Sequence, residues 1–310
     1  MKNPTQFHTI TITIYALIAF AANSILCRLA MGTFQIDGAS FTTIRLISGA
    51  LTMLFIFALL NKNKTDSKTS EIVNETKTIS YFSLNPLSSW LAPLMLFGYA
   101  WCFSYAYIRL DTGTGALILF ATVQLTMLGY NLFKGNRPNR LSWIGIVMAF
   151  VGFIYLMLPT ATQPSLVGFM WMLVAGLCWA AYTLLGKSSK NAILDTGVNF
   201  IRSVPLAIIA MVLALFISGA NAIYFTFEGV VFAIFSGSLA SACGYTIWYF
   251  ALKKITITQA AVSQLSVPVI AAIGGFIVLA EPLTGSFIVS AGLILIGIML
   301  TYLKPNAPKT

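Results

Sequence analysis

One segment of the chain occurs twice, as AYIRLDTGTGALILFATVQLTMLGYN at residues 106–131 and as ALKKITITQAAVSQLSVPVIAAIGGF at residues 251–276. The two copies align without a gap, and the alignment continues as far as Leu158 and Leu303. Both copies contain long apolar runs separated by short basic or polar turns. The chain is therefore predicted to consist of two copies of one unit built from apolar helices.

The likeness extends toward the start of each half. Residues 20–28, FAANSILCR, resemble residues 179–187, WAAYTLLGK, and TIR at residues 43–45 resembles FIR at residues 200–202. Each half contains five apolar spans, so the second copy must enter the membrane in the opposite direction to the first. Inverted repeats of this kind occur in many transporters, where they form one site that opens to either side of the membrane.

The composition indicates an all-α integral membrane protein. The chain of 310 residues is 58% hydrophobic and 8% charged, whereas soluble domains are about a quarter charged. Its apolar runs are close to the length of about 20 residues that a helix needs to cross a bilayer. We expect ten transmembrane helices arranged as two inverted five-helix repeats. The ten spans are predicted at about residues 10–30, 40–60, 90–109, 112–133, 141–158, 165–186, 196–218, 229–252, 256–279 and 285–303.

The distribution of basic residues predicts the orientation. If the N-terminus lies inside, most lysines and arginines face the cytoplasm, and only Arg28 and Arg109 fall on the opposite face. This bias follows the positive-inside rule and predicts cytoplasmic N- and C-termini. Anionic membrane lipid then accounts for the net charge of +10, and no nucleic-acid partner is expected. The predicted cytoplasmic basic residues are Lys2, Lys62, Lys64, Lys68, Lys77, Lys134, Arg137, Arg140, Lys187, Lys190, Lys253, Lys254, Lys304 and Lys309.

The repeat divides the chain into two predicted domains, residues 1–160 and residues 161–310. Within the first domain, residues 61–89 are rich in Lys, Thr, Ser, Asn and Glu. Such a composition cannot bury enough apolar surface to fold alone, so a polar cytoplasmic loop is predicted there.

The sequence indicates neither a metal site nor a cofactor. The single histidine, His8, precedes the first span, which excludes histidine metal sites and catalytic triads. The four cysteines lie inside spans without the spacing of a metal site. No carboxylate can be placed with certainty at the centre of a span. The sequence therefore gives no residue for proton coupling, which stays possible.

Polar residues at span centres are the first candidates for a site, because hydrocarbon cannot solvate them. Asn23 lies deep in the first span and Gln124 at the centre of the fourth. Each is expected either to line a substrate pathway or to form a hydrogen bond between helices.

Gln264 and Pro268 form a local pattern in the ninth span. Proline has no N–H to donate to the carbonyl four residues earlier, so the carbonyl of residue 264 is predicted to be free. Lipid cannot form a hydrogen bond with a free carbonyl, so the carbonyl must face a cavity or bind a water molecule or a neighbouring residue. The alternative is a plain proline kink.

Two arginines occupy matching positions inside spans, Arg45 and Arg202. Interior arginines are costly and are usually paired, and Asp37 and Asp195 precede them as candidate partners. Three interpretations stay open. The arginines could anchor gate elements, bind a substrate carboxylate, or extend to the membrane surface.

Aromatic residues supply the remaining candidates. Trp101 and Tyr105 share one face of the third span, and Tyr245 and Trp248 share one face of the eighth, while Tyr182 is the repeat mate of Asn23. Aromatic walls with few polar groups suit small amphipathic ligands. Packing and a belt at the membrane interface are the alternatives.

The run YFALKKITITQAAVSQLSVPVIAAIGGFIVLAEPLTG, residues 249–285, resembles a pattern of the drug/metabolite transporter superfamily, and within it of the EamA-type ten-helix exporters. The likeness covers nearly the whole chain and includes Arg45 and Arg202. It implies ten transmembrane helices, a central cavity between two EamA-like repeats, and export or exchange of small metabolites such as amino acids. The first half departs at Asn136 and Val123, which stand where Glu281 and Pro268 stand in the second half.

The sequence therefore predicts a secondary transporter of the bacterial inner membrane that works by alternating access on a small-molecule substrate, as a monomer or homodimer. A membrane-embedded enzyme acting on lipid precursors is an alternative, although no cluster of ionisable residues at one interface supports it. A structural or signalling membrane protein is another. The predicted substrate-binding residues are Asn23, Trp101, Tyr105, Gln124, Tyr182, Tyr245, Trp248, Gln264 and Pro268, with Arg45 and Arg202 as gating or structural residues.

Overall fold

The computed structural model describes residues 4–31, 35–62, 90–110, 112–158, 165–219, 223–279 and 285–303. These residues form helices, apart from short connections and one isolated antiparallel bridge between Ile36 and Phe225. The predicted loop at 61–89 lies almost wholly outside the described residues. The α-helices are α1 (Pro4–Met31), α2 (Gly38–Lys62), α4 (Leu91–Tyr107), α5 (Thr112–Phe133), α6 (Arg140–Met157), α7 (Leu166–Gly186), α8 (Ala192–Ser218), α9 (Phe227–Phe235), α10 (Gly244–Leu252), α11 (Ile257–Ser263), α12 (Val267–Leu279) and α13 (Gly285–Leu303).

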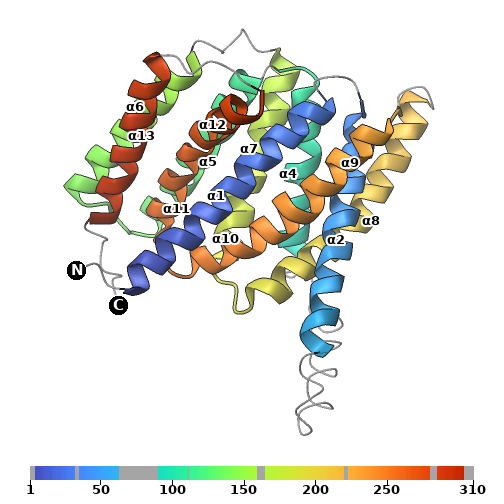
Figure 1. The fold of residues 1–310 in the computed structure, drawn as a ribbon, viewed down its shortest axis with the longest axis horizontal. Helices are drawn as coiled ribbons and strands as arrows, with labels where there is room; N and C mark the ends of the chain where they lie inside the picture. The colour runs from blue at the N-terminus through green and yellow to red at the C-terminus, as the bar shows by residue number, and fades with distance from the viewer. Residues whose placement is uncertain are drawn as a thin grey trace, which may run out of the picture.

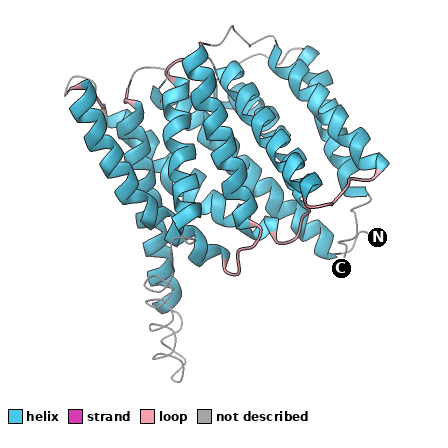
Figure 2. Ribbon diagram, turned by 180° about the vertical axis from the view of Figure 1, so that it is seen from behind, coloured by secondary structure: helices cyan, strands magenta, loops and turns pink. Residues whose placement is uncertain are grey.

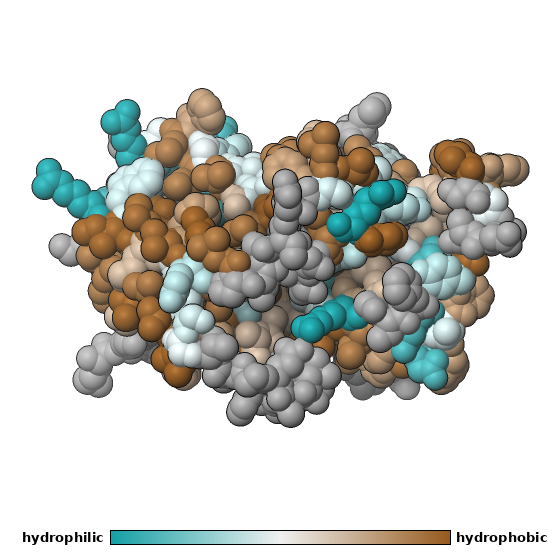
Figure 3. All heavy atoms as spheres, turned by 90° about the horizontal axis from the view of Figure 1, so that it is seen from above, coloured by the Kyte–Doolittle hydropathy of each residue, from teal (hydrophilic) through white to brown (hydrophobic). Residues whose placement is uncertain are grey.

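The described helices match the ten predicted spans. Within the described residues, nine helical segments are long and apolar enough to cross a bilayer. The tenth predicted span corresponds to α4, which has 17 residues. Large apolar side chains on the outside of the bundle are exposed, and hydrophobic groups dominate much of the described surface in Figure 3. Such a surface is stable against lipid rather than water, so the prediction of an all-α integral membrane protein is confirmed.

The packing between the two halves comes in matched pairs. Helix α1 packs on α10 and α12, and its repeat mate α7 packs on α4 and α5. The mates α2 and α8 pack on each other at one edge of the bundle, and the mates α6 and α13 pack on each other at the opposite edge (Figures 1 and 2). A two-fold relation between two five-helix repeats produces this pattern, because each contact has a counterpart in which the halves exchange roles.

Two spans of the second half depart from regular α-helix. The span Phe227–Leu252 contains a π-helical segment, η4 (Ser236–Cys243), between α9 and α10. The next span contains a 3-10 turn, η5 (Gln264–Ser266), between α11 and α12. Their counterparts in the first half, α4 and α5, are continuous α-helices. Irregular turns inside helices often mark functional sites or hinges.

Asp37 joins the start of α2 to the connection before α9. One carboxylate oxygen accepts from the backbone N–H groups of Ala39 and Ser40, both at 2.9 Å, and therefore caps α2. The other oxygen accepts from the N–H of Tyr224 at 3.1 Å. Asp37 was a candidate partner for Arg45. The structure shows that this expectation is wrong, because backbone groups occupy its carboxylate.

Replacing Asp37 by alanine is expected to lower the melting temperature measured by thermal unfolding in detergent. Loss of a cap costs about 0.5–2 kcal/mol, and here the N–H of Tyr224 also loses its acceptor. Asn191→Ala is a matched control, because Asn191 caps α8 through the N–H of Leu194 at 3.2 Å within the same helix. Equal losses in the two variants would show that the connection to Tyr224 contributes nothing.

Candidate functional site

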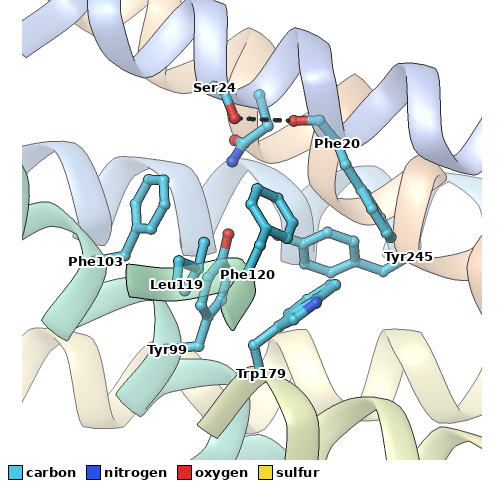
Figure 4. Close-up of a pocket in the computed structure, with 9 residues that line it drawn as sticks. Phe20, Ser24, Tyr99, Phe103, Leu119, Phe120, Trp179 and Tyr245 are labelled. Atoms are coloured by element: carbon cyan, nitrogen blue, oxygen red, sulfur yellow. Dashed lines mark hydrogen bonds between the residues drawn. The ribbon is translucent and has the colours of Figure 1, made fainter. Parts of the chain in front are cut away.

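A small cavity lies at the centre of the bundle, between the two halves (Figure 4). It measures about 20 Å³, which is room for roughly one water molecule. Helices α1, α4 and α5 of the first half and α7 and α10 of the second supply its walls. A cavity of this size is too small for a metabolite, which could occupy it only after the helices around it move apart. The lining residues are Phe20, Asn23, Ser24, Tyr99, Phe103, Leu119, Phe120, Trp179 and Tyr245.

Aromatic rings form most of the wall. The ring of Phe20 packs edge-on against Trp179, Tyr245 and Trp248, with centroids 5.2, 5.7 and 5.4 Å apart. Trp179 also contacts Tyr99 at 4.8 Å and Tyr245 at 4.9 Å. Offset and edge-on aromatic pairs add about 0.5–1.5 kcal/mol each beyond the area that they bury. The cluster therefore presents rigid apolar faces with a few polar tips.

Arg45 is the charged residue next to this cluster, and only 1% of its surface is exposed. Its Nε donates to Ser241 Oγ at 3.0 Å, and Nη2 donates to the Tyr245 hydroxyl at 2.5 Å. The guanidinium also lies over the ring of Tyr99, 5.4 Å from the centroid. The third nitrogen, Nη1, has no hydrogen-bond partner among the residues that the structure describes. Hydroxyl groups and an aromatic face hold the cation in place of the expected carboxylate.

Three amide side chains lie buried around the centre. Asn23 accepts a hydrogen bond from Ser236 at 2.6 Å, and Gln264 accepts one from the indole N–H of Trp179 at 2.6 Å. Each of these bonds joins two different helices. Gln124 is only 2% exposed, and neither amide atom has a partner in the described part of the chain. An unpaired buried amide is costly, so Gln124 needs a partner that the described residues do not supply.

The carbonyl of Gln264 is not free, and the prediction based on Pro268 is wrong on this point. The backbone N–H of Val267 donates to it, because the helix tightens into the 3-10 turn η5. A 3-10 turn shifts each acceptor by one residue, so the proline is accommodated without an open carbonyl. Pro268 is itself buried at the start of α12.

A family model described as the EamA-like transporter family matches residues 8–158 and 166–303 of the chain. The chain belongs to this family. It is therefore a membrane transporter rather than an enzyme, as the resemblance predicted. The matched ranges include every residue that lines the central cavity.

Several proteins are similar to this EamA-family chain. An uncharacterized protein of Pseudomonas aeruginosa is 39% identical over 280 residues, which are 89% of this chain and 88% of that protein. An uncharacterized transporter of Bacillus subtilis is 23% identical and covers 87% of this chain and 89% of its own. A Salmonella typhimurium protein named "Probable amino-acid metabolite efflux pump" is 26% identical and covers 65% of this chain and 71% of its own. One crystal structure, with 14% identity, covers 97% of this chain and 99% of its own with a TM-score of 0.75, which shows likeness of fold alone.

The structure places Trp101 and Tyr105 of the EamA-family chain away from the cavity. They are half-buried and stack on each other at 5.1 Å, and Tyr105 also contacts Trp171 of α7. Tyr99 and Phe103 of the same helix line the cavity instead. Two residues of an α-helix separated by two positions point about 200° apart. Because both faces of α4 are aromatic, the sequence could not distinguish them.

Phe20 and Trp179 were missed by the sequence reasoning, although a signal for them exists. They are repeat mates in the segments FAANS and WAAYT, and their rings touch in the structure. Residues related by a two-fold axis meet only near that axis. A matched pair of aromatic residues inside the first helix of each repeat therefore points to the centre.

The mates Arg45 and Arg202 differ in their surroundings. Arg202 is buried and lies over the ring of Trp90, 5.3 Å from the centroid. Trp90 precedes α4 and is 41% exposed, so this contact lies at the rim of the bundle. Arg45 instead adjoins two residues of the cavity wall.

Lysines connect the turns that follow α7 and α10. The ammonium of Lys187 donates to the carbonyl oxygens of Leu252 and Ile255, and Lys253 donates to the carbonyl of Lys190 at 2.8 Å. Burial lowers the pKa of Lys187. These hydrogen bonds tie α7 to α10 at one end of the bundle, while the contacts of Asp37 with Tyr224 tie the halves elsewhere.

Proposed function

We propose that the protein is a secondary transporter of the bacterial inner membrane that exports or exchanges small amphipathic metabolites, amino acids or similar compounds, by alternating access. The observation that carries this proposal is the small cavity between the two halves, whose wall is aromatic and borders Arg45. Among the described residues, Arg45 keeps an unpaired nitrogen, and the buried amide of Gln124 on α5 is unpaired as well. Ligand sites are typically apolar with a few placed polar groups. The name of the Salmonella relative favours amino acids as the first class to test.

The proposed pathway passes between the aromatic residues Tyr182, Tyr245 and Trp248 and the amides Asn23, Gln124 and Gln264. All six side chains are buried. Trp101 and Tyr105 are not part of the proposed site. Pro268, just after the 3-10 turn, is proposed as a hinge, and Arg202 as an anchor at the rim.

Alternating access requires the closure at one side to open while the other stays shut. The contacts of Asp37 with Tyr224 are proposed to close the outer side, and those of Lys187 with the turn after α10 the inner side. This assignment places both termini in the cytoplasm, in line with the positive-inside rule. Residues 1–160 and 161–310 are the two units proposed to move against each other. Proton coupling of transport remains a prediction, and so does assembly as a monomer or a homodimer.

The test is efflux of labelled amino acids from vesicles that contain the purified protein. Saturable flux is expected, and Gln264→Leu and Gln124→Ala are each expected to reduce it at least tenfold. Gln264→Leu also removes the acceptor of the Trp179 N–H, which costs about 1–3 kcal/mol, so thermal unfolding must show that the variant is folded. Thr122→Val is a matched control, because Thr122 lies on α5 and bonds to the carbonyl of Ile118 in its own helix. Unchanged flux in both glutamine variants would refute the site, and absence of flux for every amino acid would refute the substrate class.

A further inference from the structure

The central cavity is bordered by a positive charge that no neighbouring side chain neutralises. Its nine lining residues carry no charge, and the donors of Arg45 bind the neutral hydroxyl groups of Ser241 and Tyr245. A cation in the membrane interior is expensive unless it is paired. The site therefore lacks one negative charge in the part of the chain that the structure describes.

The guanidinium adjoins the cavity wall. Tyr245 and Tyr99 both line the cavity, and both contact Arg45, one through its hydroxyl group and the other through its ring. The fork of an arginine is suited to a carboxylate, because two of its N–H groups can point at the two oxygens.

A second buried donor belongs to the same aromatic cluster. The indole N–H of Trp248 has no acceptor among the described residues, and Trp248 is fully buried. Its ring contacts Phe20, which in turn contacts Tyr245, the residue that holds Arg45. The guanidinium and indole N–H groups can only donate, so a ligand that binds to them must supply acceptor oxygens.

We propose that Arg45 binds the carboxylate of the transported molecule through Nη1, so that the carrier selects molecules with a carboxylate and rejects the same molecules when that group is neutral. This inference rests on the proposed function and narrows its substrate class. The aromatic wall receives the apolar part of the substrate, and the cation fixes its polar end. Amines and amides of the same shape leave the guanidinium unpaired and bind weakly.

The test measures binding, so it does not depend on transport. Thermal shifts of the purified full chain are recorded with phenylalanine, 3-phenylpropionate and phenylalaninamide, which share one apolar body. Both carboxylates are expected to raise the melting temperature, and the amide is expected to need at least a tenfold higher concentration. Absence of any shift with the carboxylates, or an equal shift with the amide, overturns the proposal, whatever the vesicle assay shows for flux.

Variants of Arg45 distinguish a role in ligand binding from a purely structural role. Arg45→Met is expected to fold, since an apolar chain often replaces a buried charge without loss of stability. It is expected to lose the preference for carboxylates, whereas Arg45→Lys keeps part of it. Arg202→Met, at the rim over Trp90, is the control and should keep the full preference. If Arg45→Met does not fold, Arg45→Lys decides alone, and a preference in Arg45→Lys equal to that of the wild-type protein refutes the role of the fork.

Discussion

Replacing Gly237 by alanine is expected to reduce transport at least tenfold and to lower the melting temperature by several degrees. Gly237 lies in η4, where it faces α2 without a side chain. A Cβ at this position would lie 2.0 Å from Ser48 Oγ and 2.1 Å from the carbonyl oxygen of Arg45. The serine side chain can turn away, but the backbone of α2 cannot. The helices must separate, which costs about 1–3 kcal/mol or more and displaces Arg45 from Ser241 and Tyr245.

Gly129→Ala in α5 is the matched control for this substitution. No described atom lies within 4 Å of a Cβ added at Gly129, and alanine favours helix over glycine by about 1 kcal/mol. Flux and melting temperature should therefore equal or exceed those of the wild-type protein. Wild-type behaviour of Gly237→Ala in both assays would show that η4 and α2 are not held in this close contact.

Replacing Gly297 by alanine is expected to lower the melting temperature by a similar amount but to spare the site. Gly297 of α13 faces α6, and a Cβ there would lie 2.6 Å from both the nitrogen of Ala149 and the carbonyl oxygen of Gly145. Both are backbone atoms, so α6 and α13 must move apart. Small residues at such an interface permit the close approach that holds helices together in lipid. The cavity is not lined by either helix.

Gly292→Ala tests whether the effect comes from the interface rather than from glycine replacement. Gly292 lies on the same helix, and no described atom is within 4 Å of its added Cβ. Thermal unfolding of the two variants should differ by several degrees, whereas initial flux per folded protein should be close to that of the wild-type protein in both. A severe loss of flux in folded Gly297→Ala would mean that the α6–α13 pair moves during transport.

The sequence predicted the ten spans well because length and apolarity alone determine which segments enter a bilayer. It also predicted that Asn23 and Gln264 are buried, since a polar group at the centre of a span must find a partner. The partners themselves could not be predicted. Ser236 and Trp179 reach them from spans far away in the chain, and their positions depend on how the helices pack.

Two predictions from the sequence were wrong because they depended on contacts that form only in the tertiary structure. The sequence could not show that α11 tightens into a 3-10 turn and satisfies the carbonyl of Gln264 within the helix. It also could not show that both carboxylate oxygens of Asp37 accept hydrogen bonds from backbone N–H groups of α2 and Tyr224. Both outcomes depend on hydrogen bonds of the backbone, whose geometry the pattern of side chains does not encode.

The π-helical and 3-10 turns occur in one half of a molecule whose halves descend from a common pattern. After duplication, the two copies of a unit can take on different roles. In the proposed cycle, the continuous helices α4 and α5 would stay rigid, and their interrupted counterparts would bend. A substrate passing through the centre would then contact one rigid wall and one flexible wall. The inward-opening and outward-opening movements would therefore differ, although the architecture is symmetric.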